Sequence, residues 1–213
     1  MSQSSPYSPS CPFCGIASAH SPCPPSTPAQ SLPTPNENLS QTHIILSTKH
    51  VLAFLDIMPL TRGHVLVIPR RHFQNLGEVR VNEGRELGKW LPIISRVVVR
   101  TILGTQPDER GEDPAHWNVV QNNGLRAAQT VPHAHFHIIP RPPLERMTAS
   151  KTSWVMFGRG QRDELDDDEG QRLAAELRTE LAKEVAKIKA TEGIDLDEDC
   201  SESGPNIPRA EKL

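Results

Sequence analysis

The stretch His133-Ala134-His135-Phe136-His137-Ile138-Ile139-Pro140-Arg141 places three histidines at alternate positions, with apolar residues between them. Successive side chains of a β-strand point to opposite faces, so we expect the three imidazoles on one face and Ala134, Phe136 and Ile138 on the other. A neutral imidazole can attack an electrophile, transfer a proton or bind a metal near neutral pH. The stretch therefore predicts a strand with a reactive face. A half-buried structural strand and a plain metal-binding row are the alternatives.

Two further blocks make this pattern specific. Residues 122–132, NNGLRAAQTVP, run directly into His133, and residues 51–72, VLAFLDIMPLTRGHVLVIPRRH, come earlier in the chain. From about residue 43 to residue 145 the chain resembles the histidine-triad (HIT) superfamily of nucleotide hydrolases and transferases. The resemblance implies an α+β, HIT-like fold, in which a helix packs across an antiparallel sheet of about five strands.

Local patterns predict the elements of that fold. β-branched and aromatic residues between turn signals predict strands over residues 43–46, 51–55, 64–68, 117–121 and 133–139. Apolar residues at helical spacing predict one helix over residues 87–102, with Gly104 placed to end it and Pro92 expected to disturb it. The same spacing, with acidic residues first and lysines last, predicts a C-terminal helix over residues 163–188.

Composition separates the domain from its ends. Before residue 40 the chain is rich in Pro and Ser and has no apolar periodicity, and after Gly193 it is acidic, so we expect both ends to be flexible except around Cys11–Ile16. The divisions that we expect are a largely flexible N-terminal segment (1–40), a HIT domain (41–145), a C-terminal helical extension (146–192) and a disordered acidic tail (193–213).

Charge and hydropathy limit the partners. The net charge is −3 and no long basic run is present, which argues against DNA or RNA as a partner. The sequence shows neither a secretory signal nor an apolar run of membrane-spanning length, so we expect a cytoplasmic or nuclear protein with no membrane partner. The resemblance adds two expectations, a purine nucleotide as substrate and a homodimer.

The pair Cys11 and Cys14 has the spacing at which two sulfurs can reach one tetrahedral zinc ion, but such a pair needs two more ligands. The resemblance implies that the others are His72 and His133. The connector from Gly15 to Gln41 is longer than that of the family. The entropy cost of closing a loop rises only slowly with its length, so the longer connector does not exclude the zinc cluster. The chemistry itself requires no cofactor, so any zinc would be structural.

The resemblance also assigns the catalytic roles. His135, the middle histidine, is implied to be the nucleophile that attacks an α-phosphorus and forms a covalent nucleotidyl-histidine, which water then resolves. His137 would donate to a phosphate oxygen, because attack on a phosphoryl centre needs donors aimed at its oxygens. His133, Gln129 and Thr130 complete the catalytic set, and Gln129 and Thr130 are implied to contact the phosphate and the leaving group.

The nucleotide pocket is expected on the same face. Asp56 either caps a turn or, as the resemblance implies, accepts hydrogen bonds from ribose hydroxyls. Phe54 and Ile57 would wall the base pocket, and Asn122, Gln129 and His137 would complete it. We expect His43, His50, His64 and His116 to be ordinary surface or core residues. Ala127-Ala128 stands where the family has glycine, and alanine adopts a positive φ only at a cost of roughly 1 kcal/mol.

These residues favour a nucleoside-phosphoramidase-like (HINT-like) branch of the family, with release of AMP from a purine nucleoside 5′-phosphoramidate. A diadenosine polyphosphate hydrolase is the alternative, because Gln129-Thr130-Val131-Pro132-His133 and Pro140-Arg141 are also found in that branch. No downstream zinc finger of the aprataxin kind follows His137, and the third histidine is not the glutamine of the uridylyltransferases. A non-catalytic nucleotide-binding adaptor is the alternative of another class.

Overall fold

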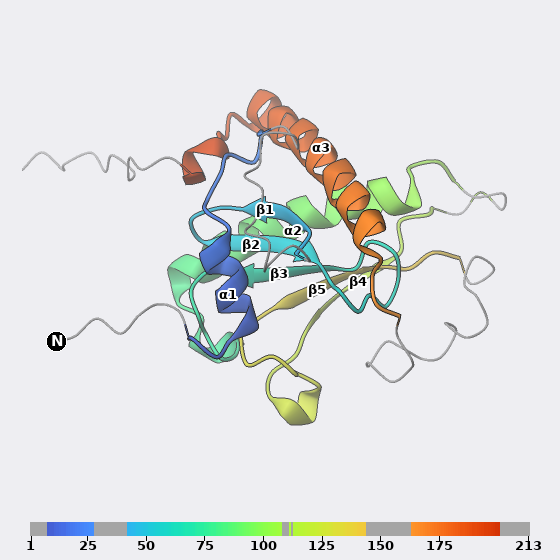
Figure 1. The fold of residues 1–213 in the computed structure, drawn as a ribbon. Coiled ribbons are helices and arrows are strands. Elements are labelled where there is room, and N and C mark those ends of the chain that lie inside the picture. Colours follow the sequence, from blue (N-terminus) through green and yellow to red (C-terminus); the bar gives the residue numbers. More distant parts are fainter. Residues whose placement is uncertain (1–7, 28–41, 108–110, 112, 144–162, 201–213) are drawn as a thin grey trace, which may run out of the picture.

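The structure, a computed structural model, describes residues 8–27, 42–107, 111, 113–143 and 163–200. A five-stranded antiparallel sheet of order β1-β2-β3-β5-β4 lies at its centre (Figure 1). The strands are β1 (Ile44–Ser47), β2 (Val51–Leu55), β3 (Val65–Pro69), β4 (Trp117–Gln121) and β5 (Phe136–Pro140). The expected α+β fold is confirmed.

Two helices cover one face of the sheet. These are α2 (Val81–Leu103), which packs on β3 and β5, and α3 (Asp167–Glu192), which packs on β1, β2 and α2 (Figure 1). Alternate strand positions such as Ala53, Val67 and Ile138 face these helices and form the larger core. Burial of this apolar area supplies most of the stability.

Helix α2 confirms the predicted apolar spacing and its end at Gly104, which has a φ of 84°. The helix begins six residues earlier than predicted and passes through Pro92 without a break. Pro92 is exposed, as is Gly88, whose carbonyl loses its intrahelical donor. Water can therefore replace the missing hydrogen bond, which explains why the proline does not end the helix.

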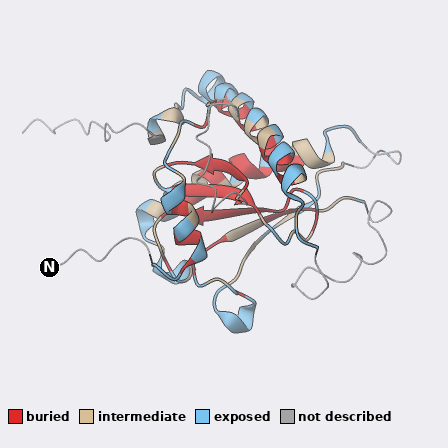
Figure 2. Ribbon diagram, viewed as in Figure 1, coloured by how far each residue is buried: buried red, intermediate tan, exposed pale blue. Residues whose placement is uncertain are grey.

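A short helix, α1 (Pro12–Ala19), covers part of the opposite face. Phe13, Cys14 and Ala17 pack against Phe54 and Ile68 in a second core. Strands β1, β2 and β3 are therefore buried along their whole length (Figure 2), which explains their continuous apolar sequence.

The N-terminal segment is more ordered than its composition predicts. Residues 8–27 pack on the domain, beyond the expected ordered stretch of Cys11–Ile16. Arg70, which is buried, donates hydrogen bonds to the carbonyls of Ala17 and His20 and so ties the end of α1 to the sheet. Composition could not reveal this partner, because Arg70 lies far from the segment along the chain.

The expected disordered tail also begins later than predicted. Leu196 is 1% exposed and belongs to the larger core, and it is followed by a 3-10 helix, η8 (Asp197–Cys200). Asp197 accepts hydrogen bonds from the backbone N–H and hydroxyl of Ser26, so the segment after α1 contacts the segment after α3. A single apolar residue after Gly193 was too weak a signal to reveal this contact. The rest of the tail, 201–213, and residues 144–162 of the extension lie outside the described residues.

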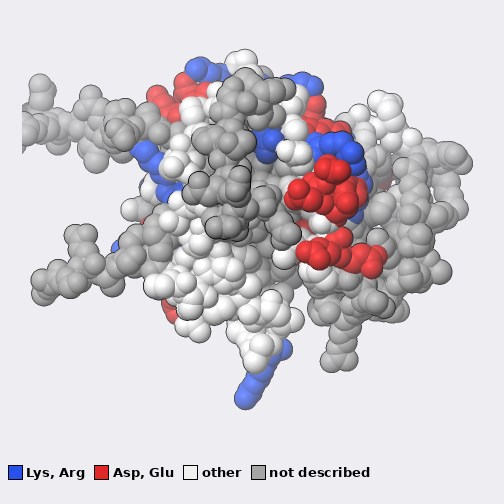
Figure 3. Space-filling view, viewed as in Figure 1, with Lys and Arg blue, Asp and Glu red and all other residues white. Residues whose placement is uncertain are grey.

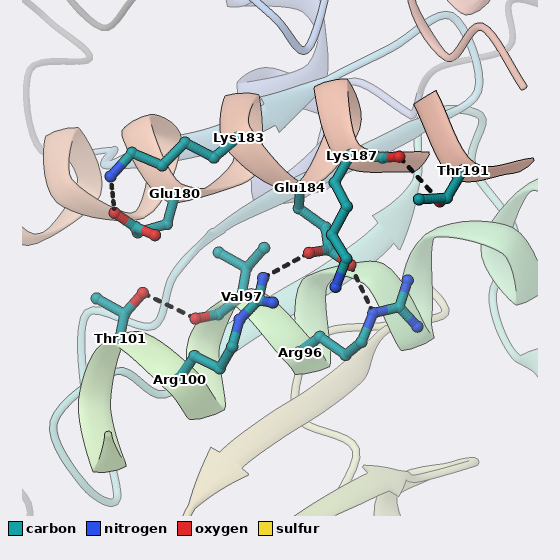
Figure 4. Close-up of polar contacts among 9 residues, drawn as sticks. All are labelled: Arg96, Val97, Arg100, Thr101, Glu180, Lys183, Glu184, Lys187 and Thr191. Atoms are coloured by element: carbon teal, nitrogen blue, oxygen red, sulfur yellow. Dashed lines mark hydrogen bonds and ion pairs between the residues drawn. The ribbon is translucent and has the colours of Figure 1, made fainter. Parts of the chain in front are cut away.

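Helix α3 is fixed at its start and at its middle. Asp166 caps it by accepting a hydrogen bond from the Glu169 N–H, and Figure 3 shows acidic side chains gathered over this end. Farther along, Glu184 binds Arg96 and Arg100 of α2 at 2.7 and 2.6 Å (Figure 4). None of the helices in the described part of the chain combines the length and apolar composition needed to cross a membrane.

Candidate active site

The three histidines are divided between two environments. Strand β5 begins at Phe136, so His133 precedes the strand and the expected strand from residue 133 was too long. The carbonyl of Phe73 accepts a hydrogen bond from the Ala134 N–H and so holds the residues that precede β5 in place. His133 consequently turns toward Cys11, the N-cap residue of α1, and Cys14 within the helix, whereas His135 and His137 face a cavity.

The cavity, of about 970 Å³, lies on the α1 side of the sheet. Its floor includes one row of cross-strand neighbours, because Phe54 pairs with Leu66, Leu66 with His137, and His137 with Val120. Expected pocket residues that line it are Phe54, Asp56, Ile57, Asn122, Thr130, His135 and His137. Pro12, Phe13 and Ile16 of α1 form a further wall, so the N-terminal segment completes the site.

His135 is held with one nitrogen free. Its Nδ1–H donates to the His133 carbonyl at 2.6 Å, so in the neutral ring Nε2 keeps its lone pair. Burial lowers the pKa of His135, and this outweighs the opposite effects of the His133 carbonyl and Asp56. The ring also meets Phe13 edge-on at 5.4 Å. His135 is therefore a buried, oriented and neutral imidazole at neutral pH.

His137 is oriented by a histidine outside the triad. His64 Nε2 lies 2.9 Å from His137 Nδ1. The Leu60 N–H donates to His64 Nδ1, while Asp56 Oδ2 lies 3.4 Å from the same atom. Because His64 Nδ1 accepts from Leu60, the proton of His64 lies on Nε2, which donates to His137. His137 must then have its own proton on Nε2.

The expectation that His64 is an ordinary residue was wrong. It is 1% exposed and joins Asp56 to the triad. The signal was available in the alternation of β3, because His64 lies two residues before Leu66 and therefore on the face that pairs with His137. The pairing of β3 with β5 could not be read from either strand alone.

Asp56 caps a turn, as expected, and it also lines the cavity. Its Oδ1 accepts a hydrogen bond from the Met58 N–H, which caps the turn after β2. The same side chain lines the cavity and is 12% exposed. Turn-capping therefore holds the carboxylate at the cavity, and the two functions do not exclude each other.

Gln129 lies behind the cavity, and its side chain is not among those that line it. Its Oε1 accepts from the Gly124 N–H at 2.6 Å, and its Nε2 donates to the Gln74 carbonyl at 2.7 Å. The amide thus closes the loop between β4 and β5 and supports Thr130. This loop includes a 3-10 helix, η4 (Leu125–Ala127), and Ala128, which has the positive φ, 63°, that the glycine of the family would favour.

The four expected zinc ligands meet in space. Cys11, Cys14, His72 and His133 place their ligand atoms within 4.8 Å of one another. His133 Nδ1 lies 3.4 Å from Cys11 Sγ and 3.7 Å from Cys14 Sγ, and Cys14 Sγ lies 3.3 Å from His72 Nδ1. Tetrahedral zinc with ordinary bond lengths separates sulfur and nitrogen ligands by about 3.6 Å. The donor set therefore fits zinc.

The protonation pattern also fits a cation. His133 donates its Nε2–H to the Pro69 carbonyl at 2.8 Å, which leaves the Nδ1 lone pair directed at the sulfurs. Burial raises the pKa of the Cys14 thiol to about 11 when no metal is bound. A bound cation reverses that preference, because it stabilises the thiolate. A longer connector has not prevented the cluster from assembling.

Known proteins resemble both the sequence and the fold. The HIT domain family model matches residues 37–144. An adenosine 5′-monophosphoramidase of Schizosaccharomyces pombe is 34% identical over 62% of this chain and 75% of its own. An adenylylsulfatase of Arabidopsis thaliana is 34% identical over 47% of this chain and 46% of its own. A zinc-bound histidine triad family protein of Mycobacterium smegmatis superposes with a TM-score of 0.51 and 28% identity, over 82% and 94% of the two chains.

The five-stranded sheet, the histidines at the cavity and these matches all indicate the same family. The chain belongs to the HIT family.

Proposed function

We propose that this chain is a nucleotide hydrolase that cleaves a purine nucleoside 5′-phosphoramidate, or a related bond at the α-phosphate, and releases AMP. The observation that supports this most directly is His135, whose Nε2 is unprotonated at the wall of a cavity large enough for a nucleotide. The S. pombe relative is named as an adenosine 5′-monophosphoramidase, and the Arabidopsis relative as an adenylylsulfatase. Both names describe hydrolysis next to an adenylyl group.

The proposed reaction has two steps. His135 Nε2 attacks the α-phosphorus, the bond from phosphorus to the leaving nitrogen breaks with its electron pair, and the leaving group takes a proton. Water then attacks the phosphorus of the nucleotidyl-histidine, the phosphorus–Nε2 bond breaks, and AMP departs. The His133 carbonyl stabilises the positive charge that forms on the His135 ring, because it accepts from Nδ1–H at 2.6 Å.

Other side chains position the substrate in this proposal. His137, with its proton on Nε2, donates to a non-bridging phosphate oxygen, while His64, whose Nδ1 accepts from the Leu60 N–H, keeps it in that tautomer. Asp56 also accepts from the ribose, and Phe54 and Ile57 contact the base. Thr130 assists protonation of the leaving group, and Asn122 contacts the phosphate. Gln129 acts by supporting the loop that holds Thr130.

Turnover and trapping test the proposal. Wild type should release AMP from adenosine 5′-phosphoramidate, and mass spectrometry after quenching in alkaline denaturant, which preserves the phosphorus–nitrogen bond, should find one adenylyl group on His135. His135→Ala should abolish both signals while its circular dichroism spectrum stays unchanged. Faster cleavage of diadenosine triphosphate would favour the dinucleotide alternative. Tight AMP binding without turnover of either substrate would favour the adaptor.

We also propose that Cys11, Cys14, His72 and His133 hold a structural zinc ion, as the donor geometry and the zinc-bound mycobacterial neighbour support. Such an ion would cross-link α1 to the chain segment that precedes β5. No step of the reaction passes through it. Since α1 forms one wall of the cavity, its attachment preserves the site's shape.

A homodimer is proposed through β4. This strand is at the end of the sheet and pairs only with β5 in the described chain. Trp117 and Val119, two residues apart, are 43% and 47% exposed. Light scattering should give a dimer mass for the wild type and a monomer mass for Trp117→Lys/Val119→Lys. A monomeric wild type would refute the dimer.

A further inference from the structure

Arg126 is at the cavity on the side away from Asp56. It lies in η4, is exposed, and lines the cavity. It is the one Lys or Arg among the lining residues that the structure describes, and it has no hydrogen bond or ion pair within that part of the chain. In Figure 3, basic side chains project at the lower edge of the molecule, where η4 lies.

The strand order places this charge relative to the histidines. Asp56 follows β2, and η4 follows β4, with β3 and β5 between those two strands. His135 and His137 belong to the β5 segment, so they lie between Asp56 and Arg126. If Asp56 holds the ribose and His135 meets the α-phosphorus, then the leaving group extends toward η4. This step rests on the proposed function.

The loop holds the arginine near that position. Gly124 and Ala128, on either side of η4, both have positive φ angles, and Gln129 bonds the Gly124 N–H across the turn. The Ala127 and Ala128 N–H groups bond carbonyls inside the loop. A closed turn of this kind restricts the backbone, so the Arg126 side chain starts from a fixed position at the edge of the cavity.

We infer that Arg126 determines leaving-group specificity, by favouring substrates whose leaving group is an anion such as sulfate or phosphate. A guanidinium presents paired N–H donors that match the oxygens of these anions. A neutral amine leaving group gains nothing from the same contact. Arg126 therefore shifts the preference from phosphoramidates toward mixed anhydrides of AMP.

The test compares two substrates and four proteins. kcat/KM is measured for adenylyl sulfate and for adenosine 5′-phosphoramidate with wild type, Arg126→Gln, Arg126→Lys and Arg85→Gln. Arg126→Gln should lower the sulfate-to-phosphoramidate ratio about tenfold, in line with the loss of one charged hydrogen bond at an exposed site. Arg126→Lys should restore part of it. Arg85, which is exposed on α2 and does not line the cavity, should leave the ratio unchanged. Equal losses for both substrates, or no loss, would overturn the inference.

A binding measurement separates this inference from the proposed hydrolysis. In the His135→Ala background, calorimetry compares ADP with AMP, since the β-phosphate of ADP represents an anionic leaving group. Arg126→Gln should weaken ADP several-fold more than AMP, and 0.5 M salt should reduce the difference. An unchanged ADP-to-AMP affinity ratio refutes the inference about Arg126 even if turnover is observed. A changed ratio supports it even if the chemistry proves different.

Discussion

The Nε2 atom of His64 lies 2.9 Å from Nδ1 of His137, so a residue that precedes β3 fixes the tautomer of the third triad histidine. Replacing His64 with Leu should therefore lower kcat by roughly tenfold or more, because His137 loses the partner that directs its proton into the cavity. His64→Gln, which can still donate an N–H, should recover much of that loss. The measurement is steady-state AMP release across pH.

Two controls accompany the His64 variants. His50 is exposed and lies outside the cavity lining, so His50→Ala should keep the wild-type rate. Thermal unfolding should show that His64→Leu is folded, because a buried histidine can also contribute to packing. A wild-type pH profile in His64→Leu would contradict the positioning role.

The cysteine cluster predicts a metal dependence. Wild-type protein should contain about one zinc ion per chain, and Cys14→Ser should lower that content and the melting temperature together. Cys23→Ser is the matched control, because Cys23 lies outside the cluster and should retain the metal. Elemental analysis and scanning calorimetry provide the two readings. Wild-type protein purified without stoichiometric zinc, and unable to take it up, would exclude the site.

The alanine pair in the loop predicts two changes of opposite sign. Ala128 has a φ of 63°, so Ala128→Gly relieves about 1 kcal/mol of strain, partly offset by the entropy that glycine adds to the unfolded chain. Ala127 is within η4 and has no such strain, so Ala127→Gly should lower the free energy of unfolding by up to about 1 kcal/mol. Urea titration of both variants provides the comparison. Equal destabilisation would contradict the difference in strain.

The parts of the site that sequence could predict are those encoded in local pattern. Alternation placed His135 and His137 on one face, and the Cys11–Cys14 spacing with the family resemblance named the four residues of the cluster. The glycine that the family has at Ala127-Ala128 marked this backbone as unusual, and the structure shows that Ala128 has the positive φ. Alternation and the cysteine spacing depend on neighbours in the chain, whereas the family resemblance supplied His72, His133 and the glycine position.

The parts that it could not predict depend on contacts between distant segments. His64 meets His137 only because β3 pairs with β5, and Leu196 is buried only because the C-terminal chain returns to the core. Arg70 is buried because α1 ends above it. A sequence pattern shows which residues are apolar or polar, but the partner that satisfies a polar group is set by topology.

The free energy of unfolding should depend on pH in part because His43 is buried. This side chain is 8% exposed beneath α3, where Gly170 leaves room for it, and burial lowers its pKa in spite of Asp167. Arg178 lowers it further. The unfolded chain then binds the proton more readily, so His43 contributes stability above its unfolded pKa of about 6.5 and loses it as pH falls toward the lower folded value.

The His43 measurement is a difference between two proteins. Acidification from pH 7.5 to pH 5.5 should destabilise the wild type more than His43→Gln, because other buried histidines titrate equally in both. Chemical denaturation at each pH gives the two free energies. Parallel pH curves for the two proteins would contradict the assignment.

The ion pairs of Glu184 should contribute to the attachment of helix α3 to helix α2. Its burial would raise its pKa, but hydrogen bonds from Arg100 and Arg96 outweigh this and lower it, so the carboxylate is ionised between α2 and α3. Glu184→Ala leaves two arginines facing an apolar contact. Because both arginines are partly exposed, we expect a loss of about 2 kcal/mol in the free energy of unfolding, less than for a fully buried pair.

Glu180 provides the comparison, since its ion pair with Lys183 lies within the exposed side of α3. Glu180→Ala should change the free energy of unfolding by less than about 0.5 kcal/mol. Urea unfolding followed by circular dichroism measures both. If Glu184→Ala were no more destabilising than Glu180→Ala, the attachment of α3 would depend on its apolar face alone, through Leu177 and Leu181. We expect Glu184→Ala to be the more destabilising, which would show that the ion pairs of Glu184 with α2 also hold α3 in place.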